Sequence, residues 1–307
     1  MTNVADLPQA TRLVTPYFDI LITSPTGASH LDKGLPCQDA SMAGQYFYRG
    51  QSYTVAAVAD GHGSEKYTQS HVGAFLALQA FQSAVSSLMR VVIETKAESG
   101  DWKSYIRNEI TLHNFTKSLH SRWIEAVTEH ANALLNHSSN DEPSVTPYGT
   151  TLAFCFAIDD LIVHGCLGDS AIFQVSDSQA TELFPLKPED SLGLGTDSLS
   201  DPRSSKKFRY EIQDKSSVGL LEPTFKNGLW VLTTDGITDS LKSPEKTLSS
   251  ILEAIKTMGM EKVSQILPSK LSQWSDQGVG DDMACIVIYQ KYPEHKTQLR
   301  GQTSDTQ

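Results

Sequence analysis

The sequence predicts an α+β protein in which pairs of helices cover largely antiparallel sheets. Two observations support this prediction. Short, β-rich apolar runs recur in both halves of the chain, and the long segments between them repeat apolar residues at three- and four-residue spacing, as helices do. Because strands and amphipathic helices must each bury one face, the two kinds of element are expected to stack in layers.

Six apolar runs are predicted to be strands, and most of them are bounded by Asp, Gly or Ser. In chain order they cover residues 53–59, 152–158, 161–167, 171–175, 229–233 and 284–289. The second, third and fourth runs are separated only by Asp159-Asp160 and by Gly168-Asp169-Ser170. Turns this tight join antiparallel neighbours, so we expect a three-stranded meander there.

Helical spacing extends over residues 67–95 and 102–136, and again over 244–258 and 261–274. A Ser-Gly-Asp break separates the first two segments and places Asp101 as a helix N-cap. Residues 138–147 are rich in Ser, Asn and Pro and are predicted to be a loop. Residues 192–207 lack periodicity and form a segment long enough to be a flap over a site.

Composition narrows the class of protein. The 307 residues include 36 acidic and 25 basic side chains, a net charge of −11, which argues against nucleic acid or an anionic membrane as the main partner. The first residues show no basic region followed by an apolar stretch, and no apolar run approaches the roughly 18 residues that span a bilayer, so we expect neither a secretory leader nor a membrane span. The four cysteines lie far apart and resemble buried hydrophobes in a reducing compartment, so we expect a cytoplasmic protein. One domain is expected over residues 21–291, between an N-terminal extension (1–20) and a disordered polar tail (292–307).

Five aspartates lie beside strand-like segments or close a short motif. Asp60 and Asp235 follow apolar strands and precede a glycine, Asp169 lies in the turn CLGDS, Asp281 precedes the strand ACIVIY, and Asp39 closes HLDKGLPCQD. Alternate residues leave a sheet on the same side, and the ends of neighbouring strands form one rim. These carboxylates therefore converge if their strands are neighbours.

A cluster of carboxylates calls for cations. Two ionised groups about 4 Å apart repel by on the order of 4 kcal/mol at intermediate dielectric, and ligands that offer only oxygen favour Mg²⁺ or Mn²⁺. The glycine after Asp60, Gly61, leaves its carbonyl open to an ion or to a bound water. Two ions roughly 3.5 to 4 Å apart would hold and activate a bridging water for attack on a phosphate ester. His62 could then donate a proton to the leaving oxygen.

Six motifs occur in order along the chain. They are CQDA (37–40), VAAVADGHG (55–63), GTT (149–151), GDS (168–170), LTTDGITD (232–239) and GDDMACIVI (280–288). Each alone is weak, because Asp-Gly pairs are common in turns, but their order and separations together are specific. Over about residues 24–290 the chain resembles the metal-dependent protein phosphatases of type 2C, particularly their bacterial-type members.

This resemblance implies a four-layer α-β-β-α sandwich of two antiparallel sheets flanked by helix pairs. It implies a serine/threonine protein phosphatase that uses Mn²⁺ or Mg²⁺ and acts on phosphorylated proteins, with a cognate kinase as a further partner. The implied binuclear metal site consists of Asp39, Asp60 as the bridge, the Gly61 carbonyl, Asp235 and Asp281. Asp169 with Asp235 matches a third, weaker metal position, and His62 matches the general acid.

The chain departs from the family pattern at a few positions. The family often carries a phosphate-binding Arg five residues before the first motif's Asp, and that position here is Gly34. Lys33 or His30 are the candidates to bind phosphate instead, although lysine lacks the bidentate fork of arginine. Asp282 stands where many members have Asn. None of these changes removes a primary metal ligand.

Other interpretations stay open at this stage. Asp60 taken alone is an ordinary turn residue, and only the companion motifs favour a ligand. Asp169 could equally form an Asx-turn, and His62 could simply pack at the rim. At the level of function, the alternatives are a non-catalytic phosphopeptide-binding homologue, which the missing Arg favours, and a phosphohydrolase of small molecules, which the same metal chemistry would serve.

Overall fold

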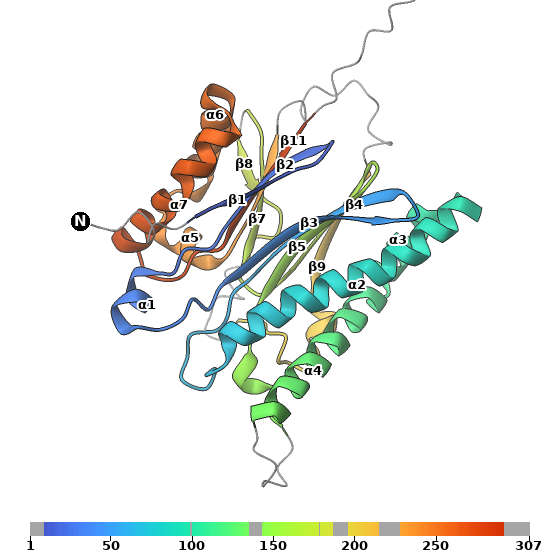
Figure 1. Cartoon of the computed structure of the whole chain (residues 1–307), viewed down its shortest axis with the longest axis horizontal. Coiled ribbons are helices and arrows are strands. Elements are labelled where there is room, and N and C mark those ends of the chain that lie inside the picture. The colour runs from blue at the N-terminus through green and yellow to red at the C-terminus, as the bar shows by residue number, and fades with distance from the viewer. Residues whose placement is uncertain are drawn as a thin grey trace, which may run out of the picture.

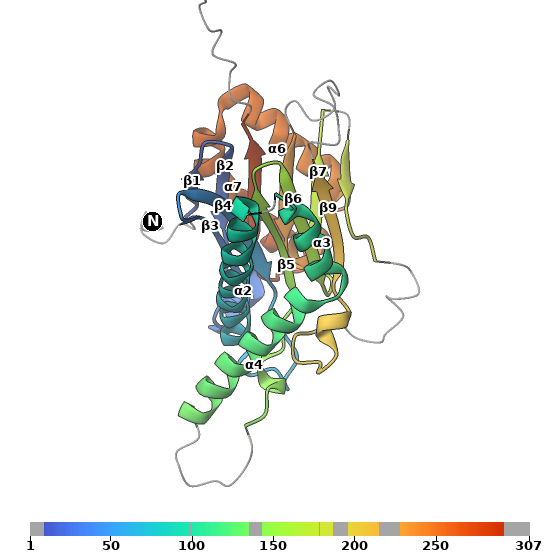
Figure 2. The ribbon, with the colours of Figure 1, turned by 90° about the vertical axis from the view of Figure 1, so that its right-hand side faces the viewer.

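The computed structural model describes residues 9–98, 100–134, 143–177, 179–186, 196–214 and 228–291. Two antiparallel sheets pack face to face in its centre, and helices cover both outer faces (Figures 1 and 2). The predicted α+β class and the four-layer arrangement are therefore confirmed.

One sheet has six strands in the spatial order β1-β2-β11-β10-β7-β8 within the described residues, and all of its pairings are antiparallel. Its strands are β1 (Thr11–Val14), β2 (Phe18–Thr23), β7 (Ala171–Val175), β8 (Ala180–Glu182), β10 (Leu229–Thr233) and β11 (Cys285–Gln290). The other sheet has the order β3-β4-β5-β6-β9, also antiparallel. Its strands are β3 (Ala40–Tyr48), β4 (Gln51–Ala59), β5 (Leu152–Ile158), β6 (Leu161–Leu167) and β9 (Arg209–Asp214).

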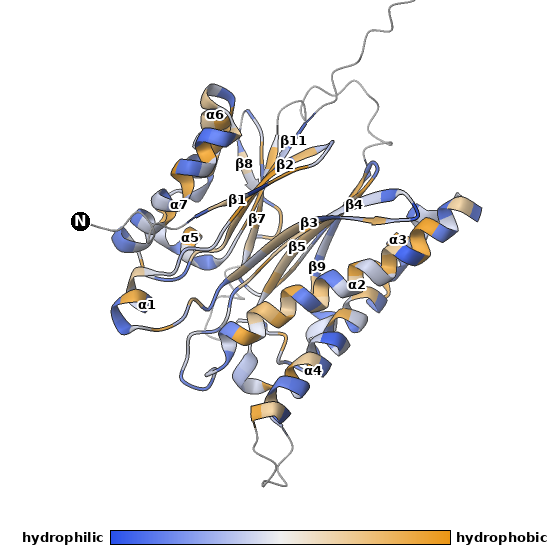
Figure 3. Ribbon diagram, viewed as in Figure 1, coloured by the Kyte–Doolittle hydropathy of each residue, from blue (hydrophilic) through white to orange (hydrophobic). Residues whose placement is uncertain are grey.

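Each sheet has its own helical cover (Figure 1). Helices α2 (Ser70–Glu98), α3 (Trp102–Thr111) and α4 (Asn114–Leu134) cover the five-stranded sheet, and α6 (Pro244–Met258) and α7 (Met260–Gln277) cover the six-stranded one. Short elements lie at the rim or in the connections: α1 (Ala28–Lys33), α5 (Asp235–Ser240) and the 3₁₀ turns η2 (Thr146–Tyr148) and η3 (Ser204–Lys206). The strands are mostly hydrophobic, whereas the helices carry both hydrophobic and hydrophilic residues (Figure 3).

The core has three apolar layers, and strand alternation sorts side chains between them. On β5 the bulky Phe154 and Phe156 face the helices, while Ala153, Cys155 and Ala157 face the other sheet. The small β5 side chains are complemented in the layer between the sheets by larger ones of the facing sheet, among them Ile172, Trp230 and Leu232, so the two sheets pack without a gap. This packing holds the two sheets, and therefore the rims that carry the candidate site, in a fixed position relative to each other.

The expected meander is only half correct. β5 and β6 do pair antiparallel, but β6 and β7 lie in different sheets, so Gly168-Asp169-Ser170 crosses from one sheet to the other. Gly168 adopts a φ of +92°, a conformation that favours glycine and lets the chain change direction there. The correction matters for the site, because it carries Asp169 between the two sheets.

The long helix expected over 102–136 is interrupted. α3 ends at Thr111, and α4 begins at Asn114 after His113 takes a left-handed φ of +57°. Asp101 occupies the predicted N-cap position, but its side chain makes no capping hydrogen bond to the described residues. No Gly or Pro marks this break in the sequence.

The structure describes part of the predicted N-terminal extension. β1 and the first half of β2 lie inside the predicted extension 1–20 and pair with each other in the six-stranded sheet. The predicted tail 292–307 lies outside the described residues. By length and composition α2 could cross a membrane, which the sequence analysis did not expect, but 56% of its most apolar window is buried within the protein.

Candidate metal centre

The sheet registers bring the predicted acids to one rim. β3 begins opposite the end of β4, and β10 ends opposite the starts of β7 and β11. The five acids follow or precede these strand ends: Asp39 before β3, Asp60 after β4, Asp169 between β6 and β7, Asp235 after β10, and Asp281 before β11. The candidate site is thus built from both sheets.

Asp60, Asp169 and Asp235 form the centre of the site. Each offers a carboxylate oxygen, and these three oxygens lie within 4.8 Å of one another. One oxygen of Asp169, Oδ1, is buried and has no hydrogen-bond partner among the described residues. Hard oxygen donors at this spacing, one of them without a partner, fit a divalent cation such as Mn²⁺ or Mg²⁺.

The other two predicted acids flank this centre. Asp281 belongs to a second group, in which its carboxylate and the side chains of His30 and Asp282 offer atoms within 4.8 Å of one another. Asp39 belongs to neither group. Its Oδ2 accepts hydrogen bonds from the Thr234 hydroxyl at 2.5 Å and from the Ala284 N–H at 3.1 Å. The structure therefore brings Asp60, Asp169 and Asp235 together, and it places Asp39 and Asp281 outside this group.

The electrostatics of the site favour protonation when no cation balances the charge. Burial raises the pKa of Asp60 and of Asp39 well above the ordinary value, and neighbouring carboxylates add to this effect, while the hydrogen bond from Thr234 opposes it at Asp39. Burial also raises the pKa of Asp235 to about 6, and Asp169 and Asp281 add to the effect. The pKa of Asp239, one turn further along α5, is raised by burial and by the same two neighbours. A cation bound among these groups would remove the repulsion, and protons and metal therefore compete for the site.

Backbone contacts hold Asp60 in place. Its carbonyl accepts hydrogen bonds from the Thr150 hydroxyl at 2.7 Å and from the Thr151 N–H at 2.9 Å, and its N–H donates to the Thr151 hydroxyl at 3.1 Å. Both threonines belong to the GTT motif (149–151), so this motif holds the backbone of Asp60. Gly61 pairs with Thr150 in an isolated bridge, and a Cβ there would lie 2.7 Å from the Gln38 carbonyl oxygen.

His62 lies beside this centre in a tight aromatic setting. The backbone N–H of His62 donates to the Gly149 carbonyl at 3.1 Å, and the centroid of its ring lies 4.7 Å from that of Tyr67. The buried ring atom Nε2 has no hydrogen-bond partner among the described residues. Burial lowers the pKa of His62; Asp169 opposes this effect and Lys66 reinforces it. Gly149 is required here, since a Cβ would lie 2.5 Å from the Tyr67 ring and 2.9 Å from the His62 ring.

Part of the predicted flap reaches the site. Of residues 192–207, the segment from 196 onward is described, and there the Thr196 hydroxyl donates to Asp169 Oδ2 at 2.6 Å. The Leu199 N–H donates to the Thr150 carbonyl, and the His120 ring bonds the Leu199 carbonyl at 3.1 Å. This segment therefore connects α4 with the carboxylate centre.

The two residues predicted to bind phosphate differ in environment. Lys33 is exposed at the end of α1. His30 is largely buried, and its Nδ1 bonds Asp282 Oδ2 at 2.7 Å, so this nitrogen is not available to a phosphate. Lys66 was not singled out from the sequence. Its ammonium lies 4.7 Å from the centroid of the Tyr67 ring, and its charge acts on His62.

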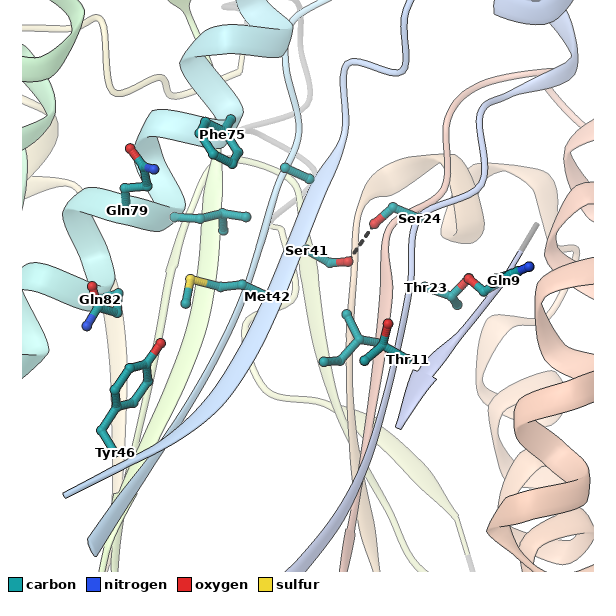
Figure 4. A pocket seen from close by; sticks show the side chains of 13 residues that line it. Gln9, Thr11, Thr23, Ser24, Ser41, Met42, Tyr46, Phe75, Gln79 and Gln82 are labelled. Carbon is teal, nitrogen blue, oxygen red and sulfur yellow. Dashed lines mark hydrogen bonds between the residues drawn. The ribbon is translucent and has the colours of Figure 1, made fainter. Parts of the chain in front are cut away.

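A cleft of about 500 Å³ opens elsewhere, between the outer strands of the two sheets and α2 (Figure 4). Hydroxyl, amide and apolar side chains line it, and the Ser24 and Ser41 hydroxyls bond each other there at 2.5 Å. None of the five acids lines this cleft. The carboxylate centre is a separate feature of the rim.

Comparison with known proteins supports the assignment of a family. The family described as Protein phosphatase 2C matches residues 26–274, so the chain belongs to the protein phosphatase 2C family. The members of this family are metal-dependent phosphatases, and the two-sheet sandwich with carboxylates at its rim agrees with this assignment. No curated protein sequence matches the chain.

Solved structures share the fold at low sequence identity. The catalytic domain of the serine/threonine phosphatase PstP in complex with two manganese ions has a TM-score of 0.52 at 14% identity, covering 90% of this chain and 99% of that one. A bacterial serine phosphatase reaches 0.56 at 15% identity, with coverage of 90% and 98%. The serine/threonine phosphatase of S. agalactiae reaches 0.53 at 17% identity, with coverage of 90% and 100%. These likenesses show the fold.

Sequence reasoning missed several residues of the site. Asp282, Lys66, Thr196 and Asp239 contact or influence the predicted residues. Asp239 is the one with a signal in the sequence, because it lies one helical turn after Asp235 in LTTDGITD. Asp282 and Thr196 meet their partners through contacts between residues far apart in the chain, and Lys66 lies close to His62 in the sequence but belongs to no motif that indicated a role.

Proposed function

We propose that the protein is a serine/threonine protein phosphatase that hydrolyses phosphoserine and phosphothreonine esters with the help of two Mn²⁺ or Mg²⁺ ions. The observation that carries this proposal is the convergence of Asp60, Asp169 and Asp235 within 4.8 Å at the rim of a protein phosphatase 2C fold. The structurally similar PstP domain, which holds two manganese ions, gives the choice of metal further support.

The metal ligands of the proposal are the residues predicted from the sequence. Asp60, Asp235, Asp281, Asp39 and the Gly61 carbonyl would hold two ions, and Asp169 with Asp235 a third. When bound, the ions supply an activated water and positive charge that stabilises the phosphoryl oxygens. The contacts of Thr150, Thr151 and Thr234 orient two of the carboxylate segments for this task.

His62 is the proposed general acid, which protonates the serine or threonine oxygen as it leaves. Its Nε2 has no hydrogen-bond partner among the described residues, and its ring is held by Tyr67 and the backbone at Gly149. Burial lowers the pKa of this side chain, so a neighbouring phosphate is needed to favour its protonated form. Such pairing is what general-acid catalysis on an anionic ester requires.

Lys66 is a third candidate, beside Lys33 and His30, to bind the substrate phosphate. It is exposed and adjacent to Tyr67 at the side of His62, whereas His30 is bonded to Asp282. Lys66→Gln and Lys33→Gln form a matched pair for this question. Loss of one charge-assisted hydrogen bond would raise KM by about tenfold. If Lys33→Gln raises KM and Lys66→Gln does not, the original assignment stands.

The central experiment measures phosphate release from a phosphothreonine peptide with Mn²⁺, with Mg²⁺ and with a chelator. Asp60→Asn and Asp281→Asn are each expected to abolish Mn²⁺-dependent hydrolysis of p-nitrophenyl phosphate while circular dichroism stays native. Asp276→Asn, an exposed aspartate on α7, is the control and should behave as wild type. Near-wild-type turnover by Asp60→Asn would reject the site.

The remaining parts of the proposal concern partners and place in the cell. We propose phosphorylated proteins as substrates, a cognate kinase as the source of their phosphate, and a cytoplasmic location. A panel of phosphopeptides against phosphorylated metabolites separates this function from a small-molecule phosphohydrolase. Calorimetry showing phosphopeptide binding without hydrolysis at saturating Mn²⁺ would favour a non-catalytic homologue.

A further inference from the structure

Asp282 is the most heavily hydrogen-bonded carboxylate beside the candidate metal centre. Its side chain is 1% exposed. Oδ1 accepts the Gly27 N–H at 2.6 Å, and Oδ2 accepts both the Gln38 N–H at 2.6 Å and the His30 ring Nδ1 at 2.7 Å. Both oxygens of this buried carboxylate are therefore satisfied by protein donors.

The three donors share one segment, residues 27–38, which contains α1 and leads directly to Asp39. The same segment is docked by its backbone. The Ser29 N–H donates to the Gly280 carbonyl at 2.9 Å, and the Ala28 N–H donates to the Ser275 hydroxyl at 3.0 Å. That hydroxyl in turn donates to the Asp281 carbonyl at 2.8 Å. The segment is thus fastened at its two ends, residues 27–30 and Gln38, to the loop that carries Asp281 and Asp282.

The backbones of these segments pack closely together. A Cβ on Gly27 would lie 2.2 Å from the carbonyl carbon of Asp281, so the two backbones touch. The Gln38 carbonyl accepts the Gly61 N–H at 3.2 Å, so the residue whose N–H is held by Asp282 also contacts the loop after Asp60. Asp282 therefore lies at the junction of the Asp39, Asp60 and Asp281 segments.

We propose that Asp282, with His30 as its partner, is a positioning residue that sets the Asp39 segment against Asp281 and thereby raises the affinity of the site for divalent cations. This inference rests on the metal site of the proposed function, and it assigns His30 a role in holding Asp282 instead of in binding phosphate. Groups that orient metal ligands in this way change metal affinity by roughly 10- to 100-fold when they are removed.

The geometry requires a carboxylate at position 282. An asparagine has one acceptor oxygen and one NH₂ group. If the amide nitrogen takes the place of Oδ2, it faces the Gln38 N–H; if it takes the place of Oδ1, it faces the Gly27 N–H. Either orientation sets two donors against each other and leaves a buried backbone N–H without a partner. Asp282→Asn is nearly identical in shape, so it tests the hydrogen bonds and not the packing.

His30 supplies a second, milder test. Asparagine at position 30 places its side-chain NH₂ near the position of the histidine Nδ1 and can still donate to Asp282, whereas leucine cannot. His30→Leu is expected to weaken Mn²⁺ binding, and His30→Asn is expected to restore most of it. Asp32→Asn, an exposed carboxylate on the same helix, serves as the matched control.

The experiment measures Mn²⁺ affinity by isothermal titration calorimetry on the full chain, together with thermal unfolding in chelator and the kinetics of p-nitrophenyl phosphate hydrolysis. We expect Asp282→Asn to weaken Mn²⁺ binding by tenfold or more, to raise the Mn²⁺ concentration for half-maximal activity equally, and to leave KM at saturating Mn²⁺ within about twofold. Should Asp282→Asn not fold, the two His30 variants provide the same comparison.

Three results would overturn the inference: wild-type Mn²⁺ affinity in Asp282→Asn, equal affinities in His30→Leu and His30→Asn, or a loss of thermal stability without any change in Mn²⁺ binding. The last would assign Asp282 to folding alone. A wild-type protein that binds Mn²⁺ but releases no phosphate would reject the proposed function, and the affinities of the variants would still decide the role of Asp282.

Discussion

Replacing Asp235 with asparagine should make the metal-free protein more stable at neutral pH, although it removes a ligand. Burial and neighbouring carboxylates raise the pKa of Asp235 from about 3.8 to about 6, and its carboxylate shares a hydrogen bond with Asp60. An asparagine amide can donate to Asp60 in the same place without adding charge. The substitution therefore removes repulsion and retains the contact.

The magnitude follows from linkage between protonation and folding. Each pKa unit between the folded and unfolded protein corresponds to about 1.4 kcal/mol, so a difference of roughly 2 corresponds to about 3 kcal/mol. Because the folded pKa is the higher one, the stabilising contribution is complete below about pH 4 and is lost as pH rises through about 6. Wild-type protein in chelator should therefore lose about 3 kcal/mol of unfolding free energy across this interval from this residue alone.

The assay is urea denaturation in chelator at pH 4 and pH 7.5 for wild type, Asp235→Asn and the control Asp276→Asn. The asparagine variant should match wild type at pH 4 and exceed it by up to about 3 kcal/mol at pH 7.5. Millimolar Mn²⁺ should reverse the order, because only wild type gains stability from tight metal binding. An Asp235→Asn variant that is no more stable than wild type at pH 7.5 would refute the reasoning.

Three further substitutions test contacts around the site and in the core. The added Cβ of Gly149→Ala would lie 2.5 Å from the Tyr67 ring and would displace His62. The substitution should therefore lower kcat by about tenfold with little change in the Mn²⁺ affinity measured by calorimetry. A loss of Mn²⁺ affinity would contradict this account. Arg209→Met removes two hydrogen bonds of 2.7 Å to the carbonyls of Gly168 and Phe184 and should lower the free energy of unfolding in urea by about 2 kcal/mol, with Arg209→Lys recovering part of the loss. Equal stability of the two variants would contradict this account. Trp123→Phe removes a hydrogen bond of 3.0 Å from the indole N–H to the Gly73 carbonyl of α2 and leaves a cavity. Thermal unfolding should therefore show that the free energy of unfolding falls by about 2 to 3 kcal/mol. A fall of less than about 0.5 kcal/mol would show that the core relaxes around the substitution.

The strands that the sequence predicts and those it misses differ in their place in the sheets. The six predicted runs form β4, β5, β6, β7, β10 and β11, all of which lie inside a sheet. The missed strands include all four sheet edges, β1, β8, β3 and β9. Edge strands bury less of each side chain, as the half-buried residues of β3 and β9 show, so their hydrophobic alternation is weak.

The candidate site also has residues that the sequence could predict and residues that it could not. Aspartates beside apolar strands could be predicted as ligands, because a strand end followed by Asp-Gly marks a rim. The sequence could not show that Asp169 lies on a crossover between sheets, since a tight turn between apolar runs is typical of a hairpin. Nor could it pair Asp282 with His30, residues 252 positions apart that meet only after the rim has formed.

The carboxylate centre takes its members from opposite halves of the sandwich. Asp60 leaves one sheet, Asp235 leaves the other, and Asp169 lies on the strand-to-strand link between them. A bound ion would therefore link the two sheets to each other. Binding of Mn²⁺ should slow amide hydrogen exchange in both β4 and β10. Neither sheet alone supplies all the carboxylates, so tight binding of the ion requires that the two sheets have assembled.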